Sequence, residues 1–115
     1  MKDKSYKELF DLSDKTAIVT GGAGILGSHF CAALAESGAS VAVIDINEKA
    51  AKKLAKDLKS KYGSKTLGIG CDVSNPKSVC SMVEQVVSEF GEINILHNNA
   101  AGKSDDLDAF FAPFE

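Results

Sequence analysis

The hydrophobic positions of this chain fall into two alternating patterns. Short and nearly continuous apolar runs predict strands buried on both faces, at about residues 16–20, 40–46, 66–71 and 93–97. Longer segments with apolar residues at helical spacing predict helices between them, at about residues 25–37, 48–61 and 76–90. The order βαβαβαβ predicts an α/β fold whose parallel strands are joined by right-handed crossovers. The expected sheet, in the order 3-2-1-4, is the first half of a Rossmann-like, doubly wound fold.

The predicted helices have recognisable ends. Asn47 and Asn75 are placed to cap two of them, Pro76 suits a first helical position, and Gly38 and Gly91 follow two helix ends. The helical spacing assigns the packed residues, in chain order, to Leu26, Phe30, Ala33 and Leu34; to Ala51, Leu54, Ala55 and Leu58; and to Val79, Met82, Val83, Val86, Val87 and Phe90. The lysines of the second helix fall on the opposite side, which predicts a solvated face.

Composition and charge are those of an ordinary globular domain. The chain has 115 residues, 44% of them hydrophobic and 25% charged, with a formal net charge of -3. The slight acidity gives no field to hold nucleic acid, and no long apolar stretch indicates a signal peptide or a membrane span. Cys31, Cys71 and Cys80 lack the spacing of a disulfide framework or a metal site. We therefore expect buried, reduced thiols, no metal, and a cytoplasmic location.

A glycine-rich turn joins the first predicted strand to the first predicted helix. Gly22-x-Gly24-x-x-Gly27 matches the dinucleotide-binding pattern, in which bare backbone lets a pyrophosphate approach the helix N-terminus. Glycine-rich turns are often only turns, but the strand before this one and the helix after it favour the nucleotide interpretation. The residues of the turn that we expect to contact the cofactor are Gly21, Gly22, Gly24, Ile25, Leu26 and Gly27.

Two aspartates follow the next two strands. Asp45 lies eighteen residues after Gly27, close to the spacing expected of the acid that binds the adenosine ribose. Its carboxylate attracts ribose hydroxyls and repels a 2′-phosphate, which predicts NAD rather than NADP, with Ile46 beside it in the site. The alternative for Asp45 is that it caps the next helix, but Asn47 is better placed for that role. Asp72, followed by Val73, either accepts the adenine amino group or is only a turn residue.

The fourth strand leads into Asn98-Asn99-Ala100, and at this point the chain resembles a known family. Over about residues 12–102 it resembles the N-terminal half of a short-chain dehydrogenase/reductase. The motifs that carry the resemblance are Thr20-Gly21, Asp45, Asp72-Val73 and Asn98-Asn99-Ala100. The resemblance implies that Asp45 selects NAD and that Asp72 and Val73 hold adenine. It also implies that Asn98 and Ala100, with Asn99 between them, border the nicotinamide ribose.

The chain departs from the family pattern at two positions. Ile25 stands where the turn usually has its middle glycine, and Gly24 is expected to keep the turn open beside it. Ala101 stands where the fourth-strand motif usually ends in glycine. Turns with the order Gly-Ile-Leu-Gly resemble those of members that act on sugar acids and related hydroxy compounds.

The catalytic pair of the family is absent from this sequence. The family transfers a hydride with the help of a Tyr-x-x-x-Lys pair and a Ser, because the Lys and the cofactor lower the pKa of the Tyr. Here Tyr6 and Tyr62 are followed four residues later by Phe10 and Thr66. His97, at a strand end, is expected to pack under the sheet rim rather than to donate a proton. No residue of the chain is therefore assigned to catalysis.

These motifs divide the chain into three segments. Residues 1–11 are a polar leader whose Leu9 and Phe10, with Leu12, can pack against the domain. Residues 12–102 are the dinucleotide-binding half-domain. Residues 103–115 are expected to be an irregular tail that leads into a missing catalytic half.

Three functions remain open at this stage. The resemblance implies the NAD(H)-binding portion of an oxidoreductase whose parent interconverts a secondary alcohol and a ketone, the 115-residue chain being inactive alone. The alternatives are a free-standing nucleotide-binding or regulatory module and an S-adenosylmethionine methyltransferase domain, which shares the glycine turn. Because the fourth strand would be an exposed parallel edge, and nothing obvious covers Phe110, Phe111 and Phe114, we expect self-association or a homo-oligomer.

Overall fold

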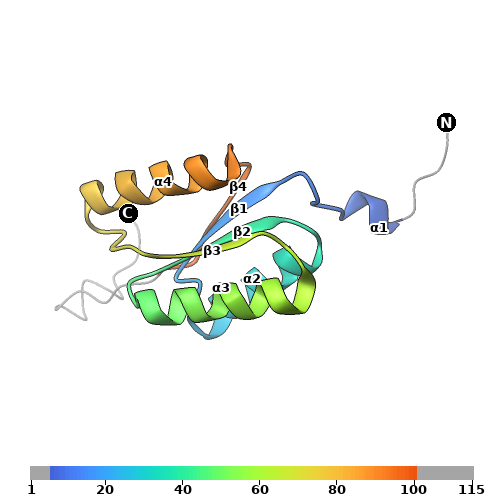
Figure 1. Ribbon diagram of the computed structural model, residues 1–115, viewed down its shortest axis with the longest axis horizontal. Helices are drawn as coiled ribbons and strands as arrows, with labels where there is room; N and C mark the ends of the chain where they lie inside the picture. Colours follow the sequence, from blue (N-terminus) through green and yellow to red (C-terminus); the bar gives the residue numbers. More distant parts are fainter. Residues whose placement is uncertain (1–5, 101–115) are drawn as a thin grey trace, which may run out of the picture.

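The structure, a computed structural model, describes residues 6–100 of the chain. Figure 1 shows a twisted sheet with helices on both faces. The elements in chain order are α1 (Tyr6–Leu9), β1 (Thr16–Thr20), α2 (Ile25–Glu36), β2 (Ser40–Asp45), α3 (Glu48–Tyr62), β3 (Thr66–Gly70), α4 (Pro76–Phe90) and β4 (Ile95–Asn98). Apart from the short α1, this is the predicted order of strands and helices.

The sheet is parallel throughout, and its strand order β3-β2-β1-β4 confirms the predicted Rossmann-like fold. α2 and α3 cover one face and α4 covers the other (Figure 1). All five residues of β1 are buried, and the side chains from Val41 to Ile44 on β2 are fully buried. Each such Val or Ile contributes about 1.5–3 kcal/mol of burial free energy before entropic costs. The two central strands therefore hold the carboxyl edge of the sheet in place.

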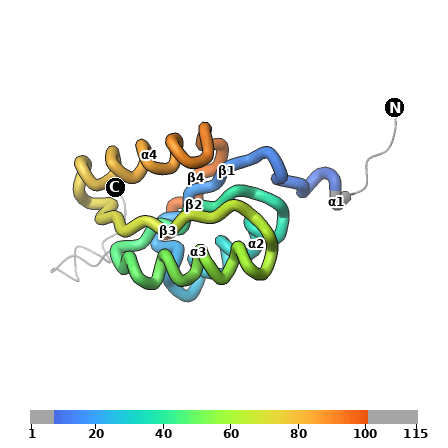
Figure 2. The backbone as a smooth tube through the Cα atoms, viewed as in Figure 1, coloured from blue at the N-terminus to red at the C-terminus, as the bar shows by residue number. Residues whose placement is uncertain are grey.

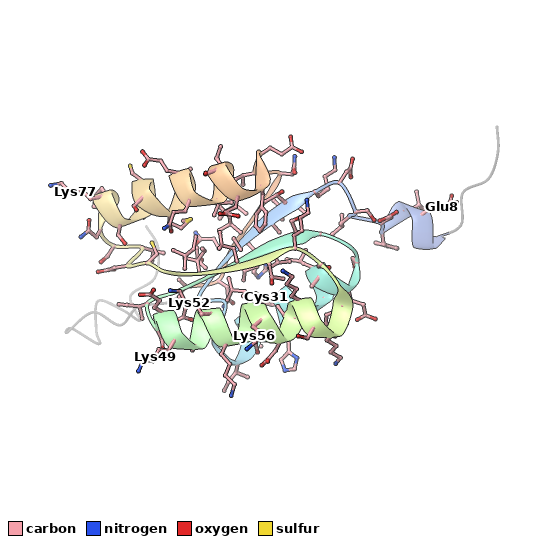
Figure 3. All side chains as sticks on the ribbon, viewed as in Figure 1. Glu8, Cys31, Lys49, Lys52, Lys56 and Lys77 are labelled. Carbon is pink, nitrogen blue, oxygen red and sulfur yellow. The ribbon has the colours of Figure 1, made fainter. Side chains whose placement is uncertain are left out.

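The predicted helix caps are confirmed. Asn47 Oδ1 accepts a hydrogen bond from Ala50 N–H at 3.1 Å, and Asn75 Oδ1 accepts from Lys77 N–H at 3.0 Å, with Pro76 in the first turn of α4. Each such cap contributes about 0.5–2 kcal/mol. The lysines of α3 are exposed as predicted, and Figure 3 labels three of them, Lys49, Lys52 and Lys56.

The predicted packed face of α2 is wrong. The helix buries Gly27, Cys31 and Ala35, whereas Leu26 is 64% exposed and Phe30 36% exposed. Of the four residues predicted to pack, Leu34 alone contacts the core, as a half-buried side chain, and Ala33 is exposed. The reason is that Gly27 lies against the glycine turn, which rotates a row of small residues toward the sheet. Small side chains let the helix axis approach the strands more closely than Leu and Phe would allow.

Two predictions for the second half of the chain also need correction. On α4, Met82 and Val86 are buried and Val79 and Phe90 are partly buried, but Val83 and Val87 are exposed. Their side of α4 has no covering element within the described residues. The fourth strand begins at Ile95 rather than residue 93. Asn94 bonds to Thr16 through both its backbone and its side chain: its N–H donates to Thr16 O at 2.9 Å, and its Oδ1 accepts from Thr16 N–H at 2.8 Å. The third strand ends at Gly70, one residue before the predicted end.

The N-terminal region is partly helical. Figure 2 shows α1 set apart from the sheet, at the end opposite the carboxyl ends of the strands. Leu9 and Phe10 are 61% and 71% exposed and do not pack against the domain, whereas Leu12 reaches the core. The predicted tail at residues 103–115 lies outside the described residues, so the predicted division into three segments stays a prediction. Within residues 6–100, no helix is long and apolar enough to cross a membrane.

Candidate functional site

The predicted site residues come together at the carboxyl edge of the sheet. A hollow of about 530 Å³ opens there, within the size range of small-molecule sites. Ligands of doubly wound folds bind at this edge, beside the point where the strand order reverses between β1 and β4. The hollow is lined by Gly21, Gly24, Ile44, Asp45, Ile46, Cys71, Asp72, Val73, Ser74, Asn99 and Ala100.

The glycine turn depends on two features that only glycine permits, a left-handed backbone conformation and a close approach. Gly21 has φ of +63°, a left-handed conformation that side chains disfavour. A Cβ on Gly27 would lie 2.1 Å from the Gly21 carbonyl oxygen, so a side chain there would overlap the turn itself. Gly22 N–H donates to Ile44 O at 2.9 Å, which fixes the turn against the end of β2. These contacts hold the start of α2 at the hollow.

Among the three long helices α2, α3 and α4, α2 is the one whose N-terminus has no side-chain cap. Gly24 is its N-cap and supplies no side-chain hydrogen bond, and the first turn carries no acidic residue. The N-termini of α3 and α4 are each capped by an asparagine side chain. α2 therefore begins beside the hollow, which Gly24 lines, and its first backbone N–H groups and the positive end of the helix dipole lie at a position that suits a phosphate group.

Ile25, which replaces the usual glycine, does not obstruct this N-terminus. It is 85% exposed, it is the first residue of α2, and it does not line the hollow. No non-glycine residue among those described has positive φ, so Ile25 sits there without backbone strain. Gly24 supplies the bare backbone instead, since a Cβ there would meet nothing nearer than Gly21 O at 3.4 Å.

Asp45 is held in a fixed orientation at the end of β2. Its Oδ2 accepts from Ala23 N–H at 3.1 Å, and its Oδ1 accepts from Asn47 N–H at 2.9 Å. One bond reaches across to the glycine turn and the other is local. The half-buried carboxylate therefore links the two parts of the predicted nucleotide site and also orders the start of the loop before α3.

Asp72 is exposed and forms an Asx-type turn. Its Oδ1 accepts from Ser74 N–H at 3.0 Å and from Ser74 Oγ at 2.6 Å. The hydrogen bonds from the Ser74 hydroxyl and backbone hold the pKa of the Asp72 carboxyl below its ordinary value. Val73, 46% exposed, presents an apolar surface to the hollow. The turn role that was the alternative for Asp72 is thus present, and the residue still lines the hollow.

The Thr20 hydroxyl organises the turn after β4. Its Oγ1 accepts from Asn99 N–H at 3.0 Å and from Ala100 N–H at 3.1 Å, and donates to Asn98 Oδ1 at 3.1 Å. Asn99 Nδ2 donates to Gly21 O at 3.3 Å. The end of β4 is therefore fastened to the end of β1 and to the first glycine of the turn.

The structure brings most, but not all, of the predicted residues to the hollow. Eight of them line it: Gly21, Gly24, Asp45, Ile46, Asp72, Val73, Asn99 and Ala100. The other five do not: Gly22, Ile25, Leu26, Gly27 and Asn98. Gly22, Gly27 and Asn98 shape the turns, and the side chain of Leu26 points to solvent. Ile44, Cys71 and Ser74 line the hollow and are not among the predicted residues, although each lies directly next to a predicted residue in the sequence.

The three cysteines and His97 differ in how far they are buried. Cys31 and Cys71 are buried as predicted, but Cys80 is exposed, and all three are free. Burial raises the pKa of the Cys31 thiol to about 12. His97 is half-buried and packs on Phe30 with ring centroids 4.1 Å apart. Among residues 6–100, no cluster of three potential metal-ligating side chains occurs.

Comparison with known proteins agrees with this fold. The sequence profile of the short chain dehydrogenase family matches residues 15–112, and the chain belongs to that family. The chain is 41% identical to the 3-oxoacyl-[acyl-carrier-protein] reductase FabG of Chlamydia muridarum, over 84% of this chain and 39% of that protein. It is 34% identical to the short chain dehydrogenase/reductase dpmpG of Macrophomina phaseolina, over 84% of this chain and 55% of that protein.

Solved structures give the same result. A 7α-hydroxysteroid dehydrogenase solved in complex with NADH and 7-oxo glycochenodeoxycholic acid superposes with a TM-score of 0.80. It is 29% identical and matches 87% of this chain but 38% of its own. The chain thus spans between 38% and 55% of the length of these relatives.

Proposed function

We propose that this chain is the NAD(H)-binding portion of a short-chain dehydrogenase/reductase whose parent protein interconverts a secondary alcohol and a ketone. The observation that carries the proposal is the uncapped N-terminus of α2, whose N-cap residue Gly24 lines the same hollow as the fixed carboxylate of Asp45. A dinucleotide carries both matching groups, a pyrophosphate and a ribose diol.

The residues of the hollow suit the successive parts of such a cofactor. The backbone around Gly24 would hold the pyrophosphate, and Asp45 would accept hydrogen bonds from the adenosine ribose. Ile46 and Val73 offer apolar contact to adenine, with Asp72 beside them. Asn99 and Ala100 also line the hollow, and the nicotinamide ribose would lie beside them. The cofactor would supply the hydride-carrying ring.

Asp45 is the basis for proposing NAD rather than NADP. The carboxylate is half-buried and both of its oxygens are already oriented by backbone N–H groups. A 2′-phosphate brought close to it would meet a like charge, whereas a 2′-hydroxyl would donate to it. Two like charges about 4 Å apart repel by about 1 kcal/mol in water and by more near a protein surface.

We propose that the 115-residue chain binds the cofactor without turning over substrate. Hydride transfer needs an acid or base at the reacting oxygen, and neither Tyr6 nor Tyr62 has the lysine four residues later that would lower its pKa. Incubating the chain with NAD and a panel of secondary alcohols should produce no NADH absorbance. Steady formation of NADH would refute this part of the proposal.

The binding itself is tested by titrating the full chain with NADH while following the nicotinamide fluorescence and the amide spectrum by NMR. We expect saturable binding with shifts at Gly24, Asp45 and Val73. The Gly24→Ala variant should fold with unchanged thermal stability yet bind NADH more weakly, because the methyl group enters the hollow. Shifts confined to residues outside the hollow would contradict the assignment.

Two further measurements separate the alternative functions. An S-adenosylmethionine methyltransferase domain would release more heat with S-adenosylmethionine than with NADH in calorimetry. A regulatory module would bind NADH while the longer parent protein showed no oxidoreductase activity. We expect binding of NADH, none of S-adenosylmethionine, and activity in the parent.

We also propose that the chain is cytoplasmic and self-associates through the β4 side of the sheet. Leu96 on β4 is 64% exposed, and Leu26 and Phe30 of α2 are exposed as well. An apolar strand at the sheet edge favours pairing with another copy. Light scattering should show association that Leu96→Lys reduces; a monomer at all concentrations would contradict it.

A further inference from the structure

A second hollow runs along the outer edge of β3, away from the glycine turn. Two adjoining cavities, of about 340 and 450 Å³, open on this edge. α3 forms one wall and α4 the other, and Figure 1 shows β3 between them. Because β3 is terminal in the strand order, its outer side has no neighbouring strand within the described sheet. The residues shared by the two cavities are Lys52, Gly68, Ile69, Ser81 and Gln85.

The ladder between β2 and β3 determines which backbone groups face this groove. Val41 N–H donates to Lys65 O at 2.9 Å at one end of the ladder. Cys71 N–H donates to Asp45 O at 3.0 Å at the other end. In a parallel ladder, alternate residues direct both N–H and C=O to the same side, so the odd-numbered residues of this stretch face β2. The residues that direct both groups into the groove are Thr66, Gly68 and Gly70.

These outward groups are partly enclosed and have no hydrogen-bond partner among the described residues. α3 packs directly on the strand, since a Cβ on Gly68 would lie 2.5 Å from Ala51 O. Gly68 is consequently buried and Gly70 half-buried. Enclosed backbone groups without partners are unfavourable, and an extended peptide presents N–H and C=O groups at the matching spacing.

The walls of the groove set the charge of the occupant. Glu84 and Glu89 line the α4 side. On the α3 side, Lys52 Nζ lies 2.7 Å from Glu48 Oε1, so this lysine is already paired. Figure 3 shows Lys52 on the side of α3 toward β3 and Lys49 pointing away from it. The groove therefore carries an excess of negative charge, which favours a basic segment.

We propose that this groove binds an extended basic peptide, which adds to β3 as a further strand of the sheet. The main-chain groups of Gly68 and Gly70 would supply the affinity, and the acidic wall of α4 would select the charge. A second copy of the chain fits less well. The antiparallel pairing that a two-fold axis gives would bring α4 against α4, and with it Glu84 and Glu89 against their copies.

The proposal is tested by NMR hydrogen exchange on the full chain with a blocked peptide of alternating Val and Thr flanked by lysines. We expect the Gly68 and Gly70 amides to become protected on binding, while the Leu67 and Ile69 amides, already bonded to β2, change little. The same peptide with prolines at alternate positions should not bind, since proline donates no hydrogen bond. Unchanged exchange at Gly68 and Gly70 with saturating peptide would overturn the proposal.

Charge variants test whether the acidic wall of α4 selects a basic peptide. Glu84→Lys combined with Glu89→Lys should weaken the binding of the basic peptide by roughly fivefold or more at low salt. The matched control, Glu36→Lys with Glu92→Lys, reverses two exposed charges that do not line the groove and should leave the affinity unchanged. Equal weakening in both pairs would contradict a site on the β3 edge. NADH binding should persist in every variant, so this result stands apart from the nucleotide proposal.

Discussion

The backbone N–H of Ala23 donates to Asp45 Oδ2 at 3.1 Å, so the glycine turn and the acid at the end of β2 form one unit. Residues twenty-two positions apart in the chain are thereby set at a fixed separation. A ligand that uses both the N-terminus of α2 and the Asp45 carboxylate meets a site that is ordered before it binds. Such preorganisation reduces the entropic cost of binding.

Removing the Thr20 hydroxyl should loosen the β4 turn. In Thr20→Val, the N–H groups of Asn99 and Ala100 lose the hydroxyl acceptor that they share. Thr20 itself is only 5% exposed. Leaving half-buried donors unpaired costs about 1–3 kcal/mol. Urea unfolding should therefore show a loss of that size, and Thr20→Ser, which keeps the hydroxyl, should lose less. Wild-type stability in Thr20→Val would show that the hydroxyl does not hold the turn.

The two ends of the glycine turn should respond differently to the same methyl group. Gly27→Ala would place a Cβ 2.1 Å from Gly21 O, and overpacking of this kind costs about 1–3 kcal/mol or more. Gly24→Ala meets nothing nearer than 3.4 Å and should stay within about 0.5 kcal/mol of wild type. Thermal melts of both variants provide the comparison. Equal melting temperatures would contradict the described packing of α2 on the turn.

The cysteines should differ in reactivity. Burial keeps the pKa of Cys31 near 12, so its thiolate is scarce at neutral pH, and the buried Cys71 is shielded from reagent. Cys80 is exposed on α4. Iodoacetamide at about pH 8 should therefore label Cys80 alone in the folded chain, and all three thiols in denaturant. Mass spectrometry after digestion reads the sites directly, and labelling of native Cys31 would mean that the core opens.

Local chemistry explains what the sequence predicts well. Asn47 and Asn75 act within a few residues, so their capping roles follow from type and position alone. The strand order follows because continuous apolar runs separated by helices admit few arrangements. The place of Asp45 at the hollow follows from its spacing after the glycines, but its bond to Ala23 N–H joins two distant segments and has no signature in the sequence.

The packed face of α2 was not predictable from hydrophobicity. Gly27, Cys31 and Ala35 give a weaker periodic signal than Leu26 and Phe30, yet contact with the turn selects the small residues. Ser74 was missed for a similar reason, because its contact with Asp72 depends on how the loop closes. Tertiary contact, rather than side-chain type, decides these positions.

The most direct test of the nucleotide site compares the dissociation constants of NADH and NADPH. We predict that the wild-type chain binds NADH about tenfold more tightly or better, a difference of about 1.4 kcal/mol. Asp45→Asn should remove most of that difference, because the amide keeps the shape without the charge that repels the 2′-phosphate. Asp57→Asn, on the exposed side of α3, should retain the wild-type preference. Equal affinities in the wild type, or an unchanged preference in Asp45→Asn, would contradict the account.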